Sequence, residues 1–134
     1  MAYLLDTNIV SDLVRHPRIG RVRERIRQVG EGAVCTSIIV AAEARYGIRK
    51  GGSAKLARQV ETVLKGLDII PFEAPADAIY ARLRAELERA GRPLGGNDLL
   101  IAAHALALGH TLVTADGGFA HIAELPRENW LTQS

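Results

Sequence analysis

Short apolar runs alternate along this chain with longer segments in which apolar residues recur every three or four positions. The short runs predict buried strands, and the longer segments predict amphipathic helices. Strands are expected at 2–5, 33–36, 68–70 and 111–114, with a last edge strand at 130–132. Helices are expected at 7–14, 19–29, 38–49, 54–67, 75–90, 97–108 and 118–123.

Strands that alternate with helices of this length pair in parallel, because each helix carries the chain back to the start of the next strand. Helices then cover both faces of the sheet. The chain has 134 residues, about the size of one domain, and it contains neither an internal repeat nor a long linker. We therefore expect residues 1–134 to form a single α/β domain. Its expected architecture is a three-layer α/β/α sandwich with a central, mostly parallel sheet.

The composition is that of an ordinary globular protein, with 48% apolar and 24% charged residues. The single cysteine, Cys35, excludes an internal disulfide. The apolar stretches are too short to cross a membrane, and no secretory signal precedes the first predicted strand. These features predict a soluble, cytoplasmic protein without a membrane partner.

Arginine dominates the basic residues, since 14 of the 17 Lys and Arg residues are arginines. Six of these arginines fall within residues 15–27. Arginine binds phosphate groups in bidentate fashion, so this segment is a candidate nucleic-acid surface. The alternative is a solvent-exposed helix face, with the arginines turned outward by an apolar stripe of Ile19, Val22, Ile26 and Val29. The sequence leaves both interpretations open.

Four acidic residues stand where a ligand would bind in such a fold. Asp6 directly follows the first predicted strand, and Asp116 comes two residues after the strand that ends at Thr114. Glu43 and Asp98 lie on predicted helices among apolar neighbours. Ligands of open α/β sheets bind beyond the carboxyl ends of the strands, so we expect these four carboxylates to converge on one cleft.

Three of the four acids also have an ordinary structural role to consider. Asp6 is suited to cap the first helix. Asp98 is suited to the start of its own helix, as a cap or as a first-turn acid that favours the helix dipole. Asp116 precedes Gly117, and Asp-Gly is common turn chemistry. The sequence alone does not choose between these roles and a binding site.

Glu43 is harder to explain by structure alone. Helical spacing places it on one face with Ile39, Ala42 and Tyr46, which we expect to be the inward stripe. No base lies three or four residues from Glu43, so no pair forms along the helix. A buried charge without a partner is costly, and either a distant arginine or a bound cation is expected to compensate it.

A cluster of carboxylates favours a hard divalent cation, because like charges repel one another unless a metal is present. Ligand sets made only of oxygen suit Mg²⁺ or Mn²⁺. The isolated cysteine and the spacing of the histidines argue against zinc, and Gly95-Gly96 lacks the Lys-Ser/Thr of a phosphate-binding loop. His104 is expected to be a hydrogen-bonded core residue. Together with the arginine-rich segment, the acids predict phosphodiester hydrolysis by a metal-activated water.

Four motifs, in order along the chain, support a closer interpretation. They are Tyr-Leu-Leu-Asp-Thr-Asn-Ile at 3–9, Ala-Ala-Glu-Ala-Arg-Tyr-Gly at 41–47, Asn-Asp-Leu-Leu-Ile-Ala-Ala-His-Ala at 97–105 and Thr-Ala-Asp-Gly-Gly-Phe at 114–119. With these motifs the chain resembles the PIN-domain ribonuclease toxins of type II toxin–antitoxin systems, the VapC family. The resemblance extends over nearly the whole chain.

The resemblance implies a PIN-like fold and a Mg²⁺-dependent endoribonuclease that is toxic unless neutralised. It makes Asp6 the first metal-binding acid and Asp98 the second principal ligand. Glu43 becomes the third acid and Asp116 an auxiliary ligand. In many relatives an asparagine stands at the position of Asp116, so the family does not require a fourth charge there.

The resemblance also implies partners for the protein. They are an RNA substrate such as a transfer RNA, a second copy of the chain in a homodimer, and a small antitoxin whose C-terminal segment covers the active site. Thr7 and Asn8 are expected to orient Asp6 or the metal-bound water. The main alternative is a catalytically silent PIN fold that serves only for protein association. A receiver-like signalling module is disfavoured, because it requires adjacent acids early in the chain and a lysine after a late strand.

Overall fold

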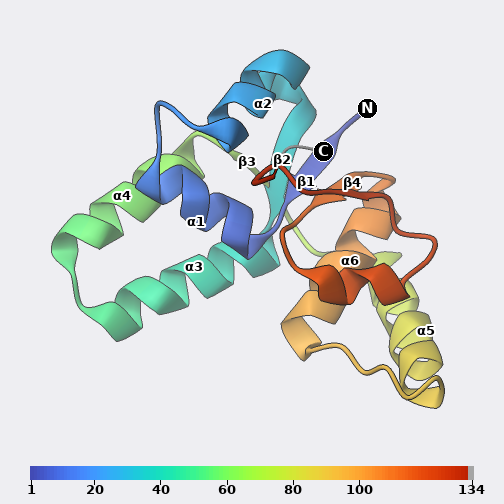
Figure 1. The fold of residues 1–134 in the computed structure, drawn as a ribbon. Coiled ribbons are helices and arrows are strands. Elements are labelled where there is room, and N and C mark those ends of the chain that lie inside the picture. Colours follow the sequence, from blue (N-terminus) through green and yellow to red (C-terminus); the bar gives the residue numbers. More distant parts are fainter. Residues whose placement is uncertain (133–134) are drawn as a thin grey trace.

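The structure, a computed structural model, describes residues 1–132 and shows a parallel sheet flanked by helices (Figure 1). The strands are β1 (Tyr3–Leu5), β2 (Val34–Ser37), β3 (Asp68–Ile70), β4 (Thr111–Val113) and β5 (Arg127–Glu128). The α-helices are α1 (Thr7–Arg15), α2 (Arg21–Val29), α3 (Ile38–Gly51), α4 (Ala54–Lys65), α5 (Ala76–Arg89) and α6 (Gly96–Leu108). Two short 3₁₀ helices are η1 (Glu31–Ala33) and η2 (Gly117–His121).

The strands lie in the order β3-β2-β1-β4-β5, and all four pairings in the described chain are parallel. On the central strand β1, Leu4 lies opposite Cys35 on one side and Leu112 on the other. Helices α1 to α4 pack on one side of the sheet and α5 and α6 on the other (Figure 1). The prediction of a three-layer α/β/α sandwich is therefore confirmed, and the sheet is parallel throughout.

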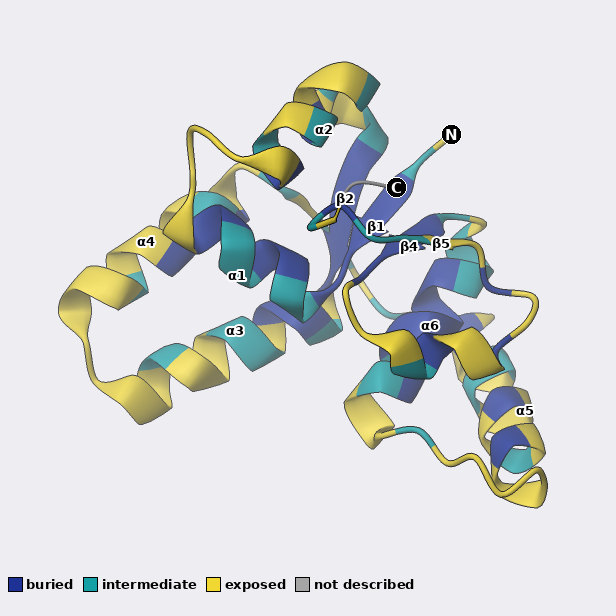
Figure 2. Ribbon diagram, viewed as in Figure 1, coloured by how far each residue is buried: buried dark blue, intermediate teal, exposed yellow. Residues whose placement is uncertain are grey.

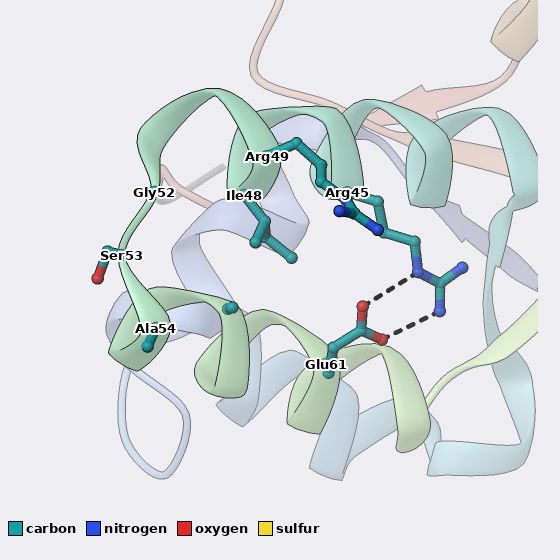
Figure 3. Close-up of a pocket in the computed structure, with 8 residues that line it drawn as sticks. Arg45, Ile48, Arg49, Gly52, Ser53, Ala54 and Glu61 are labelled. Carbon is teal, nitrogen blue, oxygen red and sulfur yellow. Dashed lines mark hydrogen bonds and ion pairs between the residues drawn. The ribbon is translucent and has the colours of Figure 1, made fainter.

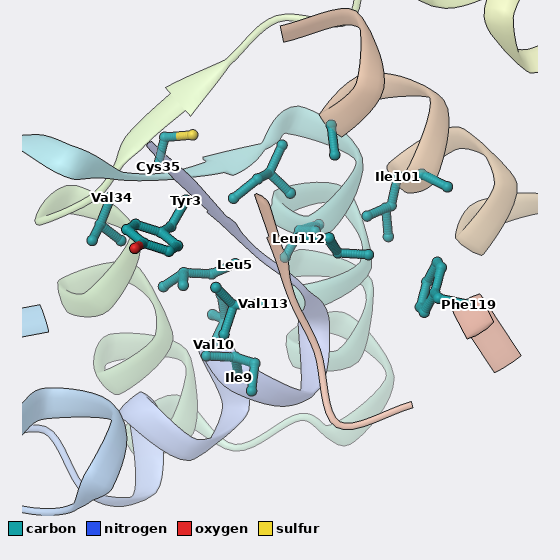
Figure 4. Close-up of a cluster of buried hydrophobic side chains, with 14 of the residues drawn as sticks. Tyr3, Leu5, Ile9, Val10, Val34, Cys35, Ile101, Leu112, Val113 and Phe119 are labelled. Carbon is teal, nitrogen blue, oxygen red and sulfur yellow. The ribbon is translucent and has the colours of Figure 1, made fainter. Parts of the chain in front are cut away.

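The core forms where the short apolar strands meet the apolar sides of the helices (Figure 4). Leu4, Leu5 and Leu112 are fully buried in the central strands. Ile9 from α1 and Ile101 from α6 reach this core from the two helical layers and are also fully buried. The outer faces of α4 and α5 are exposed, whereas α6 is largely covered (Figure 2).

The strand order creates a crevice at the carboxyl end of the sheet. After β1 the chain proceeds toward β2, while β4 returns to pair with the opposite edge of β1. The connections that leave β1 and β4 therefore diverge, and such a switch point is where open α/β sheets bind ligands. Asp6 and Thr114, the first residues after these two strands, stand at this crevice.

Two predictions near the helical and strand ends were wrong. The last strand lies at Arg127–Glu128, where it pairs with β4, and not at 130–132. Trp130 lies instead over the core, with its ring 5.1 Å from that of Tyr3 and its indole N–H donating to Glu128. Helix α2 begins at Arg21, which leaves Ile19 79% exposed outside its apolar stripe.

Within residues 1–132, no helix is long and apolar enough to span a bilayer.

Candidate active site

Asp6 is the most buried of the four acids, with 3% of its surface exposed. One carboxylate oxygen, Oδ1, accepts a hydrogen bond of 2.8 Å from the backbone N–H of Thr7 at the start of α1. The other, Oδ2, accepts a hydrogen bond of 2.7 Å from the hydroxyl of Thr114. Asp6 thus caps α1 and also faces the crevice, so the same side chain can serve as a helix cap and as part of a binding site.

Asp116 lies in the exposed loop that follows β4. Its Oδ1 accepts a hydrogen bond of 2.8 Å from the N–H of Gly118, which caps η2. Its own backbone N–H donates to the hydroxyl of Thr114. The turn chemistry expected of the Asp-Gly sequence is therefore present, and it holds the carboxylate beside the end of β4.

Glu43 reaches the crevice from α3. Its Oε1 accepts a hydrogen bond of 2.7 Å from the Thr7 hydroxyl, and its Oε2 accepts one of 3.3 Å from the side-chain amide of Asn97. Both partners are neutral, and no arginine pairs with this carboxylate within residues 1–132. The charge of Glu43 is oriented by its neighbours and is not compensated by a protein cation.

The predicted inward stripe of α3 was wrong in its direction. The buried side of this helix carries Val40 and Ala41, whereas Tyr46 is 66% exposed and Glu43 is half-buried. The face that Ile39, Glu43 and Tyr46 share borders the crevice at Glu43 and is exposed at Tyr46, and only Ile39 packs partly against the core. The packing of α3 on the sheet and on α4 selects the buried side.

Asp98 lies in the first turn of α6, where the N-cap is Gly95 and not Asp98 itself. Of its two suggested roles at the helix start, the first-turn position is the one observed. Its carboxylate makes no hydrogen bond with any residue in the described part of the chain. The neighbouring Asn97 does, and its bond to Glu43 links the start of α6 to α3.

The four carboxylates act on one another through their charges. Burial, followed by the charges of Asp6, Asp116 and Glu43, raises the pKa of Asp98 to about 6. Burial also raises the pKa of Asp6, against the opposing effect of the hydrogen bonds from Thr114 and Thr7. Among residues 1–132 no three acidic, histidine or cysteine side chains lie close enough to enclose one ion as they stand. The four groups nevertheless offer only oxygen donors, which suit a hard divalent cation.

The residues that orient the acids were predicted only in part. Thr7 binds both Asp6, through its N–H, and Glu43, through its hydroxyl. Asn8 makes no side-chain hydrogen bond to Asp6 within residues 1–132; its side-chain carbonyl accepts a hydrogen bond from the N–H of Ala115 and so holds the loop after β4. Thr114, whose hydroxyl donates to Asp6, was missed as an orienting residue. Its position in the Thr-Ala-Asp motif was the available signal.

His104 is a core residue, as predicted. It is 2% exposed, and its Nδ1 lies 2.7 Å from the Ser37 hydroxyl, which also accepts from the N–H of Ile39 to cap α3. Burial lowers the pKa of His104, which favours the neutral ring. The contact joins α6, which carries Asp98, to the start of α3, which carries Glu43.

A groove lies between α3 and α4, away from the crevice (Figure 3). Its walls include Ile48 and Ser53, and Arg45 spans it to form a two-point ion pair with Glu61 at 3.1 and 3.2 Å. None of the four acids lines this groove. The candidate site is therefore the open crevice at the end of the sheet and not this hollow.

The PIN domain family matches residues 3–125, a range that includes all four acids. A parallel sheet with the acids gathered at its switch point is in keeping with that match. The fold and the site thus define a PIN domain protein.

Relatives with known names match nearly the whole chain. Ribonuclease VapC2 of Rickettsia felis is 38% identical, over 97% of this chain and 98% of its own length. The tRNA(fMet)-specific endonuclease VapC of Shigella flexneri is 32% identical, over 97% of this chain and 98% of its own. The crystal structure of VapBC2 from Rickettsia felis bound to a DNA fragment from their promoter has a TM-score of 0.87 at 37% identity, covering 97% and 99% of the two chains. The chain belongs to the VapC group of the PIN domain family.

Proposed function

We propose that this protein is the toxin of a type II toxin–antitoxin pair and acts as a Mg²⁺-dependent endoribonuclease, with Mn²⁺ as an alternative ion. The observation that carries the proposal is the charge of the crevice. Four carboxylates meet there, and none of them takes part in an ion pair within residues 1–132. Such a cluster is stable near neutral pH when a cation binds to it.

Asp6 and Asp98 are the proposed principal ligands, Glu43 is the third acid, and Asp116 is the auxiliary ligand. When bound, the cation supplies positive charge at the scissile phosphate and lowers the pKa of water. Asp6 is held by the Thr114 hydroxyl and Glu43 by the Thr7 hydroxyl, so two ligands are oriented in advance. In the proposed hydrolysis a water oxygen joins phosphorus, and the P–O bond to the leaving nucleotide breaks.

The proposed substrate is RNA, and a transfer RNA is the proposed class of target. The ribonuclease names of the Rickettsia felis and Shigella flexneri relatives support this choice, and the Shigella protein is named for a transfer RNA. The match of one family to residues 3–125 also supports the view that residues 1–134 form one catalytic domain.

A small antitoxin is the proposed protein partner, acting on a homodimer of this chain. A crevice with uncompensated negative charge attracts an arginine or lysine side chain from a partner, which would occupy the place of the cation. The solved relative from Rickettsia felis is a VapBC assembly, which supports a cognate partner. We place the protein in the cytoplasm, where its RNA substrate is found.

Cleavage of total RNA by the purified protein tests the proposal, with sequencing of the RNA ends to identify the target. We expect cleavage with Mg²⁺ or Mn²⁺, none with EDTA, and none from the Asp6→Asn variant purified in parallel. Equal cleavage by wild type and Asp6→Asn would overturn the assignment. A well-folded wild-type protein that cleaves no RNA yet binds its antitoxin would favour the catalytically silent alternative.

A further inference from the structure

The aromatic side chains of this protein are few, and one of them differs from the rest. The chain has three Tyr, two Phe and one Trp. Tyr3, Phe119 and Trp130 are buried, and Phe72 and Tyr80 are half-buried. Tyr46 alone among these six is exposed, at 66% of its surface. A large aromatic ring in water at this position has no role in packing the core.

Tyr46 lies on the flank of α3 that also carries the candidate metal ligand Glu43. At 3.6 residues per turn, Glu43, Tyr46 and Lys50 follow one another along the same side of the helix, over about 10 Å. Lys50 is exposed and lies in the last turn of α3. An acid in the crevice, an aromatic ring and a base therefore form one row that leads away from the proposed cleavage site.

The opposite flank of α3 has a different task. Arg45 pairs there with Glu61 of α4, and Arg49 and Ile48 line the groove between the two helices (Figure 3). By contrast, neither Tyr46 nor Lys50 makes a side-chain hydrogen bond or ion pair with any residue of the described chain. The side of α3 that faces α4 therefore makes contacts within the protein, whereas the side with Tyr46 and Lys50 remains available to a ligand.

We propose that Glu43, Tyr46 and Lys50 form a track for single-stranded RNA, in which a base next to the cleaved bond stacks on Tyr46 and a neighbouring phosphate binds Lys50. The proposal rests on the proposed ribonuclease function. The order of the groups supports it, because a strand whose phosphate lies at the acids and which continues along this flank of α3 meets Tyr46 first and Lys50 next. Stacking on an exposed ring is available to every base, and a lysine beside it binds the backbone, as in other single-strand binding surfaces.

Binding of a short fluorescent single-stranded RNA in EDTA, where the proposed cleavage stops, tests the track. Tyr46→Ala is expected to raise Kd by about 5- to 150-fold, the range for loss of one stacked base. Tyr46→Phe keeps the ring and is expected to bind as wild type does. Lys50→Gln is expected to reduce the slope of log Kd against log salt by about 0.7, the value for one phosphate contact on a single strand.

Two matched variants serve as controls. Leu56→Ala removes an exposed apolar side chain from α4, and Arg49→Gln removes one positive charge from the groove between α3 and α4. Both are expected to leave Kd within about twofold of wild type and so to show that the effect belongs to the track. With Mg²⁺, Tyr46→Ala is expected to raise KM for RNA more than it lowers kcat.

The outcomes separate this proposal from the function on which it rests. If wild type cleaves RNA and Tyr46→Ala binds and cleaves it equally well, the track is wrong and the ribonuclease stands. If Tyr46→Ala instead dissociates the homodimer or releases the antitoxin while Kd for RNA is unchanged, Tyr46 is a protein contact and the track is again wrong. If wild type neither binds nor cleaves RNA, both proposals fail.

Discussion

The acid crevice and the arginine-rich helix α2 are two concentrations of like charge in the molecule, and they differ in how that charge is compensated. Figure 1 shows α2 beside the amino-terminal end of the strands, whereas the acids lie at the carboxyl end. Arg23, Arg25 and Arg27 form ion pairs with Glu31, Glu128 and Glu24. Arg21, Arg23 and Arg27 also donate to the carbonyl oxygens of Leu131, Pro17 and Arg18. Asp6, Glu43 and Asp116 accept hydrogen bonds only from neutral donors, and the Asp98 carboxylate accepts none within residues 1–132.

The difference shows how an unusual composition should be interpreted. A run of six arginines stands out in the sequence, yet four of them hold the C-terminal segment and the loop before α2 in place. The acids are spread over more than a hundred positions and stand out only after folding. Charge that the fold neutralises supports structure, and charge that it leaves uncompensated indicates a ligand. The structure thus favours the structural interpretation of the arginine-rich segment.

The largest expected effect is on catalysis in the crevice. Asp98→Asn removes one charge from the proposed metal site without removing volume. We expect a loss of about three orders of magnitude in kcat/KM, equivalent to about 4 kcal/mol of transition-state stabilisation. The measurement is RNA cleavage at saturating Mg²⁺. Cleavage within tenfold of wild type would show that Asp98 is not a principal ligand.

A smaller contrast lies within the crevice itself. Glu43 extends from a packed helix and is held by two side chains, whereas Asp116 lies on an exposed loop beside two glycines. Glu43→Ala is therefore expected to lower the cleavage rate about 10- to 100-fold, and Asp116→Ala less, because a ligand oriented by two side chains on a packed helix contributes more than one on an exposed loop. Rates measured side by side at saturating Mg²⁺ decide the order. The opposite order would show that the metal orders the loop.

Much of the fold and of the acid crevice could be predicted from the sequence, because local rules place the strands and the acids that follow them. Apolar runs with helices between them require a parallel sheet, and Asp6 and Asp116 lie just beyond the ends of two of its strands. Their convergence then depends only on the switch point of an open sheet. The ordinary roles suggested for these acids were also correct, since Asp6 caps α1 and Asp116 caps η2.

The remaining features depend on contacts that local patterns do not contain. Periodicity shows that Ile39, Glu43 and Tyr46 share a face of α3, but only packing decides that Val40 and Ala41 are buried instead. The hydrogen bond from Thr114 to Asp6 joins residues 108 positions apart, and no spacing rule predicts it. The local pattern around Trp130 likewise predicts a strand, because it does not show that the indole ring packs against Tyr3 in the fold.

The burial of Asp98, together with the repulsion from the other acids of the crevice, also predicts an effect of pH on stability. The pKa of Asp98 is about 6 in the fold, against 3.8 ordinarily, so the folded protein binds more protons than the unfolded chain between about pH 4 and 6. The charge of Asp98 therefore destabilises the metal-free fold at pH 7, and this cost falls as the pH decreases. In EDTA, Asp98→Asn is expected to melt a few degrees above wild type at pH 7.

The difference in melting temperature between the two proteins isolates this carboxyl group, because His104 and every other titrating group are common to both. We expect the difference to shrink through pH 6 and to vanish near pH 4. Saturating Mg²⁺ is expected to reverse its sign at pH 7, since the wild type then gains more from the cation. A difference that grows as the pH falls would contradict the assigned repulsion.

The smallest expected effect is at the other concentration of charge. The Arg25 guanidinium lies 3.1 Å from Glu128, 2.9 Å from Gln28 and 5.4 Å from the centre of the Trp130 ring. Arg25→Gln is expected to lower the free energy of unfolding by about 0.5–1.5 kcal/mol, through loss of a partly exposed ion pair and a cation–π contact. Urea unfolding followed by Trp130 fluorescence measures it.

The matched control for Arg25 is Arg18→Gln, which makes the same change in net charge. Arg18 lies in the exposed loop before α2, and its side chain makes no hydrogen bond within residues 1–132. We expect Arg18→Gln to leave stability unchanged, and we expect both variants to cleave RNA within about twofold of wild type, with the same dependence on salt. If the salt dependence of RNA binding falls by about 0.7 for each lost charge, the arginines contact phosphate. Helix α2 would then be a second nucleic-acid surface. Charges that are paired within the fold could then also bind a ligand, and pairing would no longer distinguish the arginines of α2 from the acids of the crevice.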